Sequence, residues 1–283
     1  MGNRYAPHKI SYPNVLAQSF SATQYSKFKY GSFLAAAKMG NELAVHFFHS
    51  DLWKRIKETG KTIVVYGAPY DCIPTASGNM SEYFASTLCL LSGQAIYEAK
   101  ISRDTTYHED YSAMSKEERW EMIKCDKFNL EYDSDVADED CIFLFVDDVL
   151  ITGSYEQCIQ NMISEQKIKE ENYFIYYAEV INPDLCASIE HKLNTYCIKT
   201  LDDISREITC NPLDHIMWNT RLVKFILKQE NDSLVRFLLV LTQAEKKKLL
   251  ALAIGNKYHE IDVYKEGLET LKVFINTKTK ETV

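Results

Sequence analysis

Residues 142–154 constrain the fold of this 283-residue chain more than any other segment. Five consecutive apolar residues, at 142–146, predict a strand that is buried on both faces, as in a parallel sheet. Asp147 and Asp148 follow this run, and a Thr-Gly-Ser turn at 152–154 then leads into a helix. Because ligands of parallel sheets bind beyond the carboxyl ends of the strands, this segment is a candidate binding site.

Each part of the segment suits a ligand that carries both hydroxyl groups and a phosphate. Adjacent carboxylates accept hydrogen bonds from neighbouring hydroxyls, and a cation relieves their mutual repulsion. Gly153 permits a tight turn that leaves backbone N–H groups open to an anion. Ser154 and Gln157 predict a capping box that opens a helix at 154–165, and helix N-termini bind phosphates.

Two other interpretations of the segment stay open. Taken singly, an Asp-Asp pair after a strand is commonly loop solvation, and a Ser-x-x-Gln box is commonly only a helix start. A phosphatase with an aspartate nucleophile also begins with a buried strand and acids. It requires Asp-x-Asp-x-Thr, whereas this chain has Asp-Asp-Val-Leu-Ile. The order of the parts favours the binding site over both.

The composition is that of an ordinary globular protein, with 46% hydrophobic and 25% charged residues. The net charge of −8 argues against a nucleic-acid-binding surface but leaves room for a local basic pocket. The eight cysteines form no Cys-x-x-Cys pair, so we expect reduced core residues rather than disulfides or a cysteine zinc site. Because no apolar leader or bilayer-length stretch is present, we expect a cytoplasmic protein without a membrane part.

Strands and helices alternate up to about residue 195, which predicts an α/β fold with a Rossmann-like parallel sheet and helices on both faces. We expect strands at 62–66, 94–101, 142–146 and 173–181, and helices at 32–49, 51–58, 79–91, 154–165 and 183–193. Asn79 and Glu82 predict the capping box of the third of these helices. The charged segment 102–140 has the length of a functional lid.

Helical spacing dominates the chain from residue 201 onward, at 213–227, 234–241, 243–254 and 264–275. No strand is expected there, and the leucine-rich stripes are typical of a packed core. We therefore predict a sheet domain at 1–200 and a C-terminal helical appendage at 201–283.

The order of these segments resembles that of the type I phosphoribosyltransferases, which use phosphoribosyl diphosphate (PRPP). Residues 63–76 resemble the strand and diphosphate loop of that family, 99–103 resemble its basic strand end, and 142–154 resemble its ribose-phosphate loop. Lys29-Tyr30-Gly31 resembles the segment before the first helix of the family. The Pro-Tyr, Ile-Pro-Thr-Ala and Thr-Gly-Ser stretches are most similar to phosphoribosyltransferase-like proteins of bacterial stress-response and conflict operons.

The resemblance implies a role for each candidate residue. Asp147 and Asp148 would be catalytic, holding the ribose hydroxyls and a Mg²⁺ cofactor. A hood at about 102–130 would close over the site. The other PRPP-binding candidates are Thr152, Gly153, Ser154, Tyr155, Ala68, Pro69, Tyr70, Asp71 and Arg103, and the hood candidates are Tyr107, His108 and Tyr111.

Three departures from the family pattern keep several functions open. Tyr155 places a bulky ring where the family has a small hydroxyl residue, Glu156 adds a negative charge to the first helical turn, and 67–79 contains no Lys or Arg. The first hypothesis is a phosphoribosyltransferase that acts on an unknown nitrogen nucleophile. The alternatives are a non-enzymatic PRPP- or nucleotide-binding regulatory module and an effector partner in a defence operon. Homo-oligomers or an operon-encoded protein partner fit each of these hypotheses, and no motif identifies the acceptor.

Overall fold

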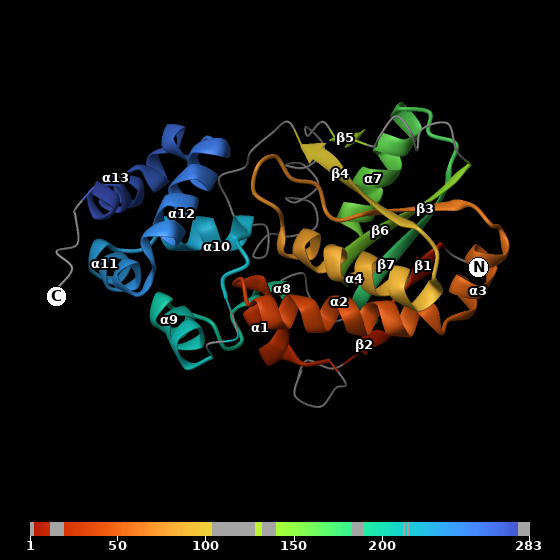
Figure 1. Ribbon diagram of the computed structural model, residues 1–283, viewed down its shortest axis with the longest axis horizontal. Helices are drawn as coiled ribbons and strands as arrows, with labels where there is room; N and C mark the ends of the chain where they lie inside the picture. Colours follow the sequence, from red (N-terminus) through yellow and green to blue (C-terminus); the bar gives the residue numbers. More distant parts are fainter. Residues whose placement is uncertain are drawn as a thin grey trace.

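The computed structural model describes residues 3–11, 20–103, 128–131, 140–182, 189–211, 213 and 215–276. The described strands form one seven-stranded sheet in the order β1-β7-β6-β3-β4-β5, with β2 also beside β7 (Figure 1). Neighbouring strands run parallel, except that β4 and β5 are antiparallel. The predicted α/β fold with a mostly parallel sheet is therefore confirmed. The strands are β1 (Arg4–Tyr5), β2 (His8–Ile10), β3 (Thr62–Tyr66), β4 (Ile96–Arg103), β5 (Phe128–Glu131), β6 (Cys141–Leu150) and β7 (Glu171–Val180).

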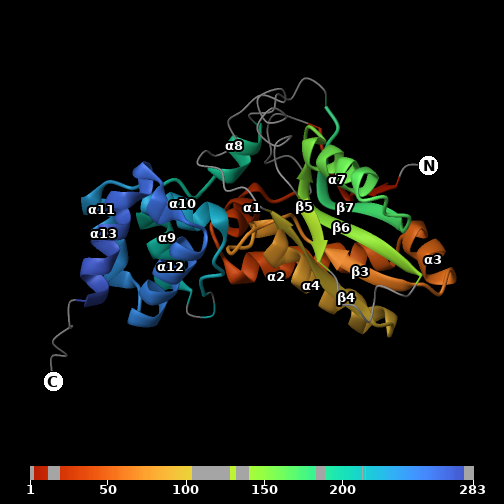
Figure 2. The same cartoon turned by 90° about the horizontal axis from the view of Figure 1, so that it is seen from above.

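Helices cover both faces of the sheet. Figure 2 shows α7 on one face and α2 and α4 on the other. The central strands are apolar on both sides because both faces are covered, which explains the uninterrupted apolar run at 142–146. The helices of this part are α1 (Ala22–Lys29), α2 (Phe33–Phe48), α3 (Asp51–Glu58), α4 (Ala76–Ser92), α7 (Ser154–Glu165) and α8 (Ile189–Asn194).

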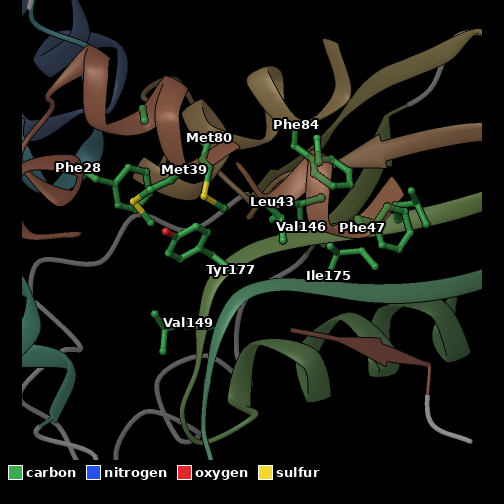
Figure 3. Close-up of a cluster of buried hydrophobic side chains, with 14 of the residues drawn as sticks. Phe28, Met39, Leu43, Phe47, Met80, Phe84, Val146, Val149, Ile175 and Tyr177 are labelled. Carbon is green, nitrogen blue, oxygen red and sulfur yellow. The ribbon is translucent and has the colours of Figure 1, made fainter. Parts of the chain in front are cut away.

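The larger core lies between the sheet and the α2–α4 layer (Figure 3). Leu43 and Phe47 of α2 meet Phe84 of α4 and Val146 of β6 there, and all four side chains are fully buried. The two helices approach closely at Gly40, where an added Cβ would lie 2.5 Å from the carbonyl oxygen of Met80. A side chain at this position would force the helices apart, so the tight layer depends on glycine.

The C-terminal helices are present as predicted and have a core of their own, with fully buried Leu222, Phe237, Leu249 and Leu268. Figure 1 shows them together beside the sheet. Ile73, which follows β3, also packs into this core, so the two parts share apolar contacts. The helices are α9 (Leu201–Cys210), α10 (Thr220–Leu227), α11 (Asn231–Val240), α12 (Gln243–Gly255) and α13 (Asp262–Asn276), with a 3₁₀ turn at Tyr258–Glu260.

Two of the predicted boundaries near the site were wrong. The strand predicted at 142–146 continues to Leu150, so the acid pair lies inside β6 rather than beyond it. The helix predicted to start at 79 starts at Ala76, because the Thr75 side chain accepts the N–H of Gly78 at 2.9 Å. Asn79 is therefore not a cap, and its side-chain amide donates to the carbonyl of Trp218 at 3.1 Å.

The cysteines in the described part of the chain are free, as expected, but they are not all core residues. Cys141 and Cys158 are buried, whereas Cys72 and Cys210 are exposed. Among the described helices, none combines the length and the apolar character needed to cross a bilayer.

Candidate functional site

A cavity of about 380 Å³ lies where β3, β4 and β6 end. Its lining includes the loop after β3, the end of β6 with the start of α7, and helix α10. The end of α1, residues of β4, β5, β7 and α8, and the segment after α12 also contribute. The predicted binding residues that the structure describes all line this one cavity. They are Ala68, Pro69, Tyr70, Asp71, Arg103, Asp147, Asp148, Thr152, Gly153, Ser154 and Tyr155.

The acid pair on β6 is held by a buried lysine. The Lys29 Nζ at the end of α1 donates to Asp148 Oδ2, and both side chains are about nine-tenths buried. The other Asp148 oxygen, Oδ1, accepts the N–H of Val149 at 2.7 Å. Both carboxylate oxygens of Asp148 therefore have partners that fix its orientation.

Asp147 has a different environment. Burial raises the pKa of Asp147 to about 7, and the charge of Asp148 adds to this effect. Lys29 and a hydrogen bond from Ser77 act in the opposite direction. A nearby cation or hydroxyl donor would stabilise the ionised form of this buried carboxyl group. The sequence predicts such a ligand for the pair.

The turn after β6 leaves the start of α7 open to an anion. Gly153 is the N-cap, with a φ of 75° that favours glycine, and its position makes no side-chain cap hydrogen bond. The predicted capping box of Ser154 and Gln157 was therefore wrong. Instead, the Ser154 hydroxyl lies 2.9 Å from the Thr152 hydroxyl. The N–H groups and these two hydroxyls suit a phosphate group.

Of the two residues that the family pattern marked as unusual, Tyr155 lines the cavity and Glu156 does not. The Tyr155 ring packs against the core between the sheet and α7 while also lining the cavity. Glu156 is 4% exposed and points to the sheet, where it accepts from Arg4 Nε at 2.6 Å and from the Tyr176 hydroxyl at 3.1 Å. Its negative charge is thus paired and turned away from the cavity.

Several backbone N–H groups of the loop after β3 donate hydrogen bonds to other parts of the chain. The N–H groups of Cys72 and Ile73 both donate to Asn256 Oδ1, at 3.0 and 2.9 Å. The N–H of Tyr70 donates to the carbonyl of Ile101 at 3.2 Å. These three amides cannot bind a diphosphate while they hold these bonds, so an anion here depends more on basic side chains.

Helix α10 supplies basic side chains that the sequence analysis did not select. Arg221, Lys224 and Lys228 line the cavity from one face of this helix and its C-cap, at a spacing of three and four residues. The sequence shows that these three residues share one helix face. Nothing in the sequence shows that this face lies beside β6. Lysines at a helix C-terminus are also common simply because they stabilise the helix dipole.

The lining contains five basic and four acidic side chains, in a protein whose net charge is −8. Two of the basic groups are paired within the lining, Lys29 with Asp148 and Arg221 with Glu190, the latter at 3.8 Å. The Lys224 Nζ lies 5.8 Å from the centre of the Tyr258 ring. The local charge thus suits an anionic ligand, although the net charge of the whole protein is negative.

The hood candidates Tyr107, His108 and Tyr111 lie outside the described residues. Arg103, at the end of β4, pairs in register with Phe128 of β5, and both residues line the cavity.

Comparisons with known proteins identify the family to which the chain belongs. The family described as PRTase ComF-like, a group of phosphoribosyltransferase-like proteins, matches residues 1–271. The chain belongs to this PRTase ComF-like family. The resemblance to phosphoribosyltransferases is therefore confirmed, and so is the type I phosphoribosyltransferase-like fold.

No curated protein matches this PRTase ComF-like chain. Two crystal structures of a hypoxanthine phosphoribosyltransferase from Staphylococcus aureus are similar to it. The tetragonal form has 13% sequence identity and a TM-score of 0.29, over 52% of this chain and 75% of that chain. The orthorhombic form has 11% identity and a TM-score of 0.28, over 59% of this chain and 78% of that chain.

Proposed function

We propose that the cavity binds PRPP with Mg²⁺ and that the protein transfers the phosphoribosyl group to a nitrogen nucleophile. One observation carries this proposal. The acid pair, the open N-terminus of α7 and the basic face of α10 all line the same cavity. PRPP carries a diol between two anionic groups, and these three features offer a complementary partner for each of its parts.

The 5-phosphate fits the start of α7. The turn at 152–154 offers the hydroxyls of Thr152 and Ser154, and the first N–H groups of the helix carry the positive end of its dipole. Holding the phosphate there would fix the distance from it to the anomeric carbon, which is a large part of catalysis by positioning.

The ribose fits the acid pair. Asp148, oriented by Lys29, would accept a hydrogen bond from one ring hydroxyl. Asp147 would accept a hydrogen bond from the other hydroxyl or hold Mg²⁺. A cation beside this carboxyl group would lower its raised pKa. When bound, Mg²⁺ would offset the charge of the leaving diphosphate. The two carboxylates would also favour the positive charge that develops on the sugar.

The diphosphate fits the basic side chains better than the backbone of the loop. Two of the loop amides are bonded to Asn256, whereas Arg103, Lys224 and Lys228 line the cavity. These cations would bind the diphosphate through charge-assisted hydrogen bonds. The C-terminal helices would then complete the site rather than merely cover the sheet.

In the proposed reaction, the lone pair of the nucleophile nitrogen forms a bond to the anomeric carbon. The bond from that carbon to the diphosphate oxygen breaks, and the electron pair leaves with the diphosphate. The nitrogen loses its proton to solvent or to the acceptor's own base. The carboxyl groups of Asp147 and Asp148 form and break no covalent bond in this step and would provide electrostatic stabilisation.

A regulatory module that binds PRPP without turnover is the second candidate, and the links between the loop and the C-terminal helices favour it. Asn256 holds the loop at 72–73, and the N–H of Thr220 donates to the carbonyl of Pro74 at 2.9 Å. A change in the loop on ligand binding would therefore act directly on α10 and on the segment after α12.

Calorimetry with PRPP, ribose 5-phosphate and diphosphate, each with and without Mg²⁺, tests ligand binding. We expect PRPP to bind most tightly and Asp147→Asn to weaken it at least tenfold. Asp262→Asn is the matched control, because this aspartate is 94% exposed and does not line the cavity. Absence of PRPP binding by the wild-type protein contradicts both candidate functions.

An assay for diphosphate release then separates the two candidates. The wild-type protein is incubated with PRPP, Mg²⁺ and a panel of purine, pyrimidine and nicotinamide-type bases. Release with any base, lost in Asp147→Asn, supports the transferase. Tight PRPP binding with no release from any base supports the regulatory module instead.

A further inference from the structure

A second cluster of polar side chains lies away from the cavity. His8 on β2 faces Glu42 and His46, which are one turn apart on α2. One ligand atom from each of the three residues lies within 4.8 Å of the others. None of them lines the cavity. Two imidazoles and one carboxylate are a common set of protein ligands for a transition metal.

The buried imidazole of His8 has an ion-pair contact with the carboxylate of Glu42. The residue is 7% exposed, and its Nε2 is a buried atom without a hydrogen bond among the described residues. This nitrogen is aimed at the cluster, 3.3 Å from Glu42 Oε1, without hydrogen-bond geometry. Buried polar atoms are almost always satisfied, and a cation between this nitrogen and the carboxylate would satisfy both ligand atoms.

The distances suit ligands around one small ion. Two ligand atoms each about 2.0–2.1 Å from a tetrahedral zinc ion lie about 3.3 Å from one another. The separation of His8 Nε2 and Glu42 Oε1 has this value. His46 Nε2 lies 3.9 Å from the same oxygen, and its side chain is 49% exposed. A small side-chain rotation of His46 would therefore complete the set.

Neighbouring groups orient the carboxylate. The Tyr177 hydroxyl donates to Glu42 Oε2 at 2.9 Å, which leaves Oε1 directed at the two histidines. The His8 ring also packs on Tyr177, with ring centres 4.6 Å apart. Outer hydrogen bonds of this kind are a regular feature of metal sites, because they fix the ligand and strengthen its donor atom.

We propose that His8, Glu42 and His46 bind a zinc ion that fastens β2 to α2. β2 has three residues and pairs with β7 at the edge of the sheet, so few backbone hydrogen bonds hold it. A metal bound by one residue of β2 and two of α2 links strand to helix directly. A metal-free cluster is the alternative, in which Glu42 Oε1 pairs with both histidines, at 3.3 Å from His8 and 3.9 Å from His46.

Cobalt(II) replaces zinc as a spectroscopic probe in the full-length protein. We expect one equivalent to bind and to give the visible bands of tetrahedral nitrogen and oxygen coordination, without a thiolate charge-transfer band. Glu42→Gln and His46→Gln should lose these bands and the rise in melting temperature that zinc gives the wild-type protein. Both positions are partly or largely exposed, so the variants should fold.

His49→Gln is the matched control, because this exposed histidine caps the same helix outside the cluster. It should bind cobalt as the wild-type protein does. Equal binding by wild type and His46→Gln overturns the proposal. A thiolate band also overturns it, because the metal would then be held by cysteines such as the exposed Cys72 and Cys210.

Discussion

The buried ion pair between Lys29 and Asp148 gives a quantitative test of how the site is built. The two side chains are 11% and 9% exposed, so solvent screens the pair only weakly. In Lys29→Met, the Asp148 carboxylate keeps the N–H of Val149 but loses its counter-charge. Removing one partner of a buried pair typically costs about 3–5 kcal/mol, a large share of the stability of any domain.

A double-mutant cycle separates this pairing from other effects of the substitution. We expect Lys29→Met and Asp148→Asn each to destabilise the protein, and the double variant to lose at least about 1 kcal/mol less than the sum. Urea unfolding followed by tryptophan fluorescence measures each free energy. Trp53 in the sheet part and Trp218 beside α10 are both buried, so the signal reports on both cores.

The exposed pair of Lys9 and Glu179 provides the control, with side chains that are 47% and 29% exposed. Lys9→Met should cost less than about 1 kcal/mol, because solvent screens the pair. The reasoning fails if Lys29→Met costs no more than Lys9→Met, or if the two substitutions at the acid pair are additive.

Three further outcomes follow from the site. Asp147 should destabilise the ligand-free protein increasingly as the pH rises from about 4 to about 7, because folded Asp147, with its pKa raised to about 7 from 3.8, retains a proton that the unfolded chain has released. Urea unfolding should show that the stability of Asp147→Asn relative to the wild type rises over this pH range, and a constant difference would contradict the assignment. The double variant Lys224→Gln, Lys228→Gln should weaken PRPP binding about 30-fold in calorimetry, at about 1 kcal/mol for each lysine, and leave ribose 5-phosphate unaffected. Glu156→Gln should destabilise the fold by about 2 kcal/mol through its bond to Arg4, while a changed PRPP affinity would show that it does act on the cavity.

Local patterns were enough to predict the centre of the fold. The apolar run at 142–146, the strand at 62–66 and the helices at 32–49 and 51–58 all depend on residues close in sequence. The strands β1 and β2 were missed, because two- and three-residue edge strands have too few residues to show an alternating pattern. The bounds predicted for α7 were right but its capping box was wrong, because a glycine in the left-handed region replaced the expected side-chain cap.

The sequence predicted site residues within single stretches of the chain, but not the contacts that tertiary packing makes between stretches. Asp147 and Asp148 could be selected because strand, acids and turn follow one another in the chain. Lys224 and Lys228 reach the same cavity from a position more than seventy residues later, through helix packing that no local pattern encodes. Lys29 belonged to a segment already selected by resemblance, but its buried pairing with Asp148 depends on the tertiary fold.

A crystal structure of the protein with PRPP and Mg²⁺ tests the central claim most directly. We predict density for the 5-phosphate at the 152–154 turn, for the ribose diol at Asp147 and Asp148, and for the diphosphate beside Lys224 and Lys228. A ligand bound outside this cavity, or bound inside it with its phosphate away from the start of α7, would contradict the account.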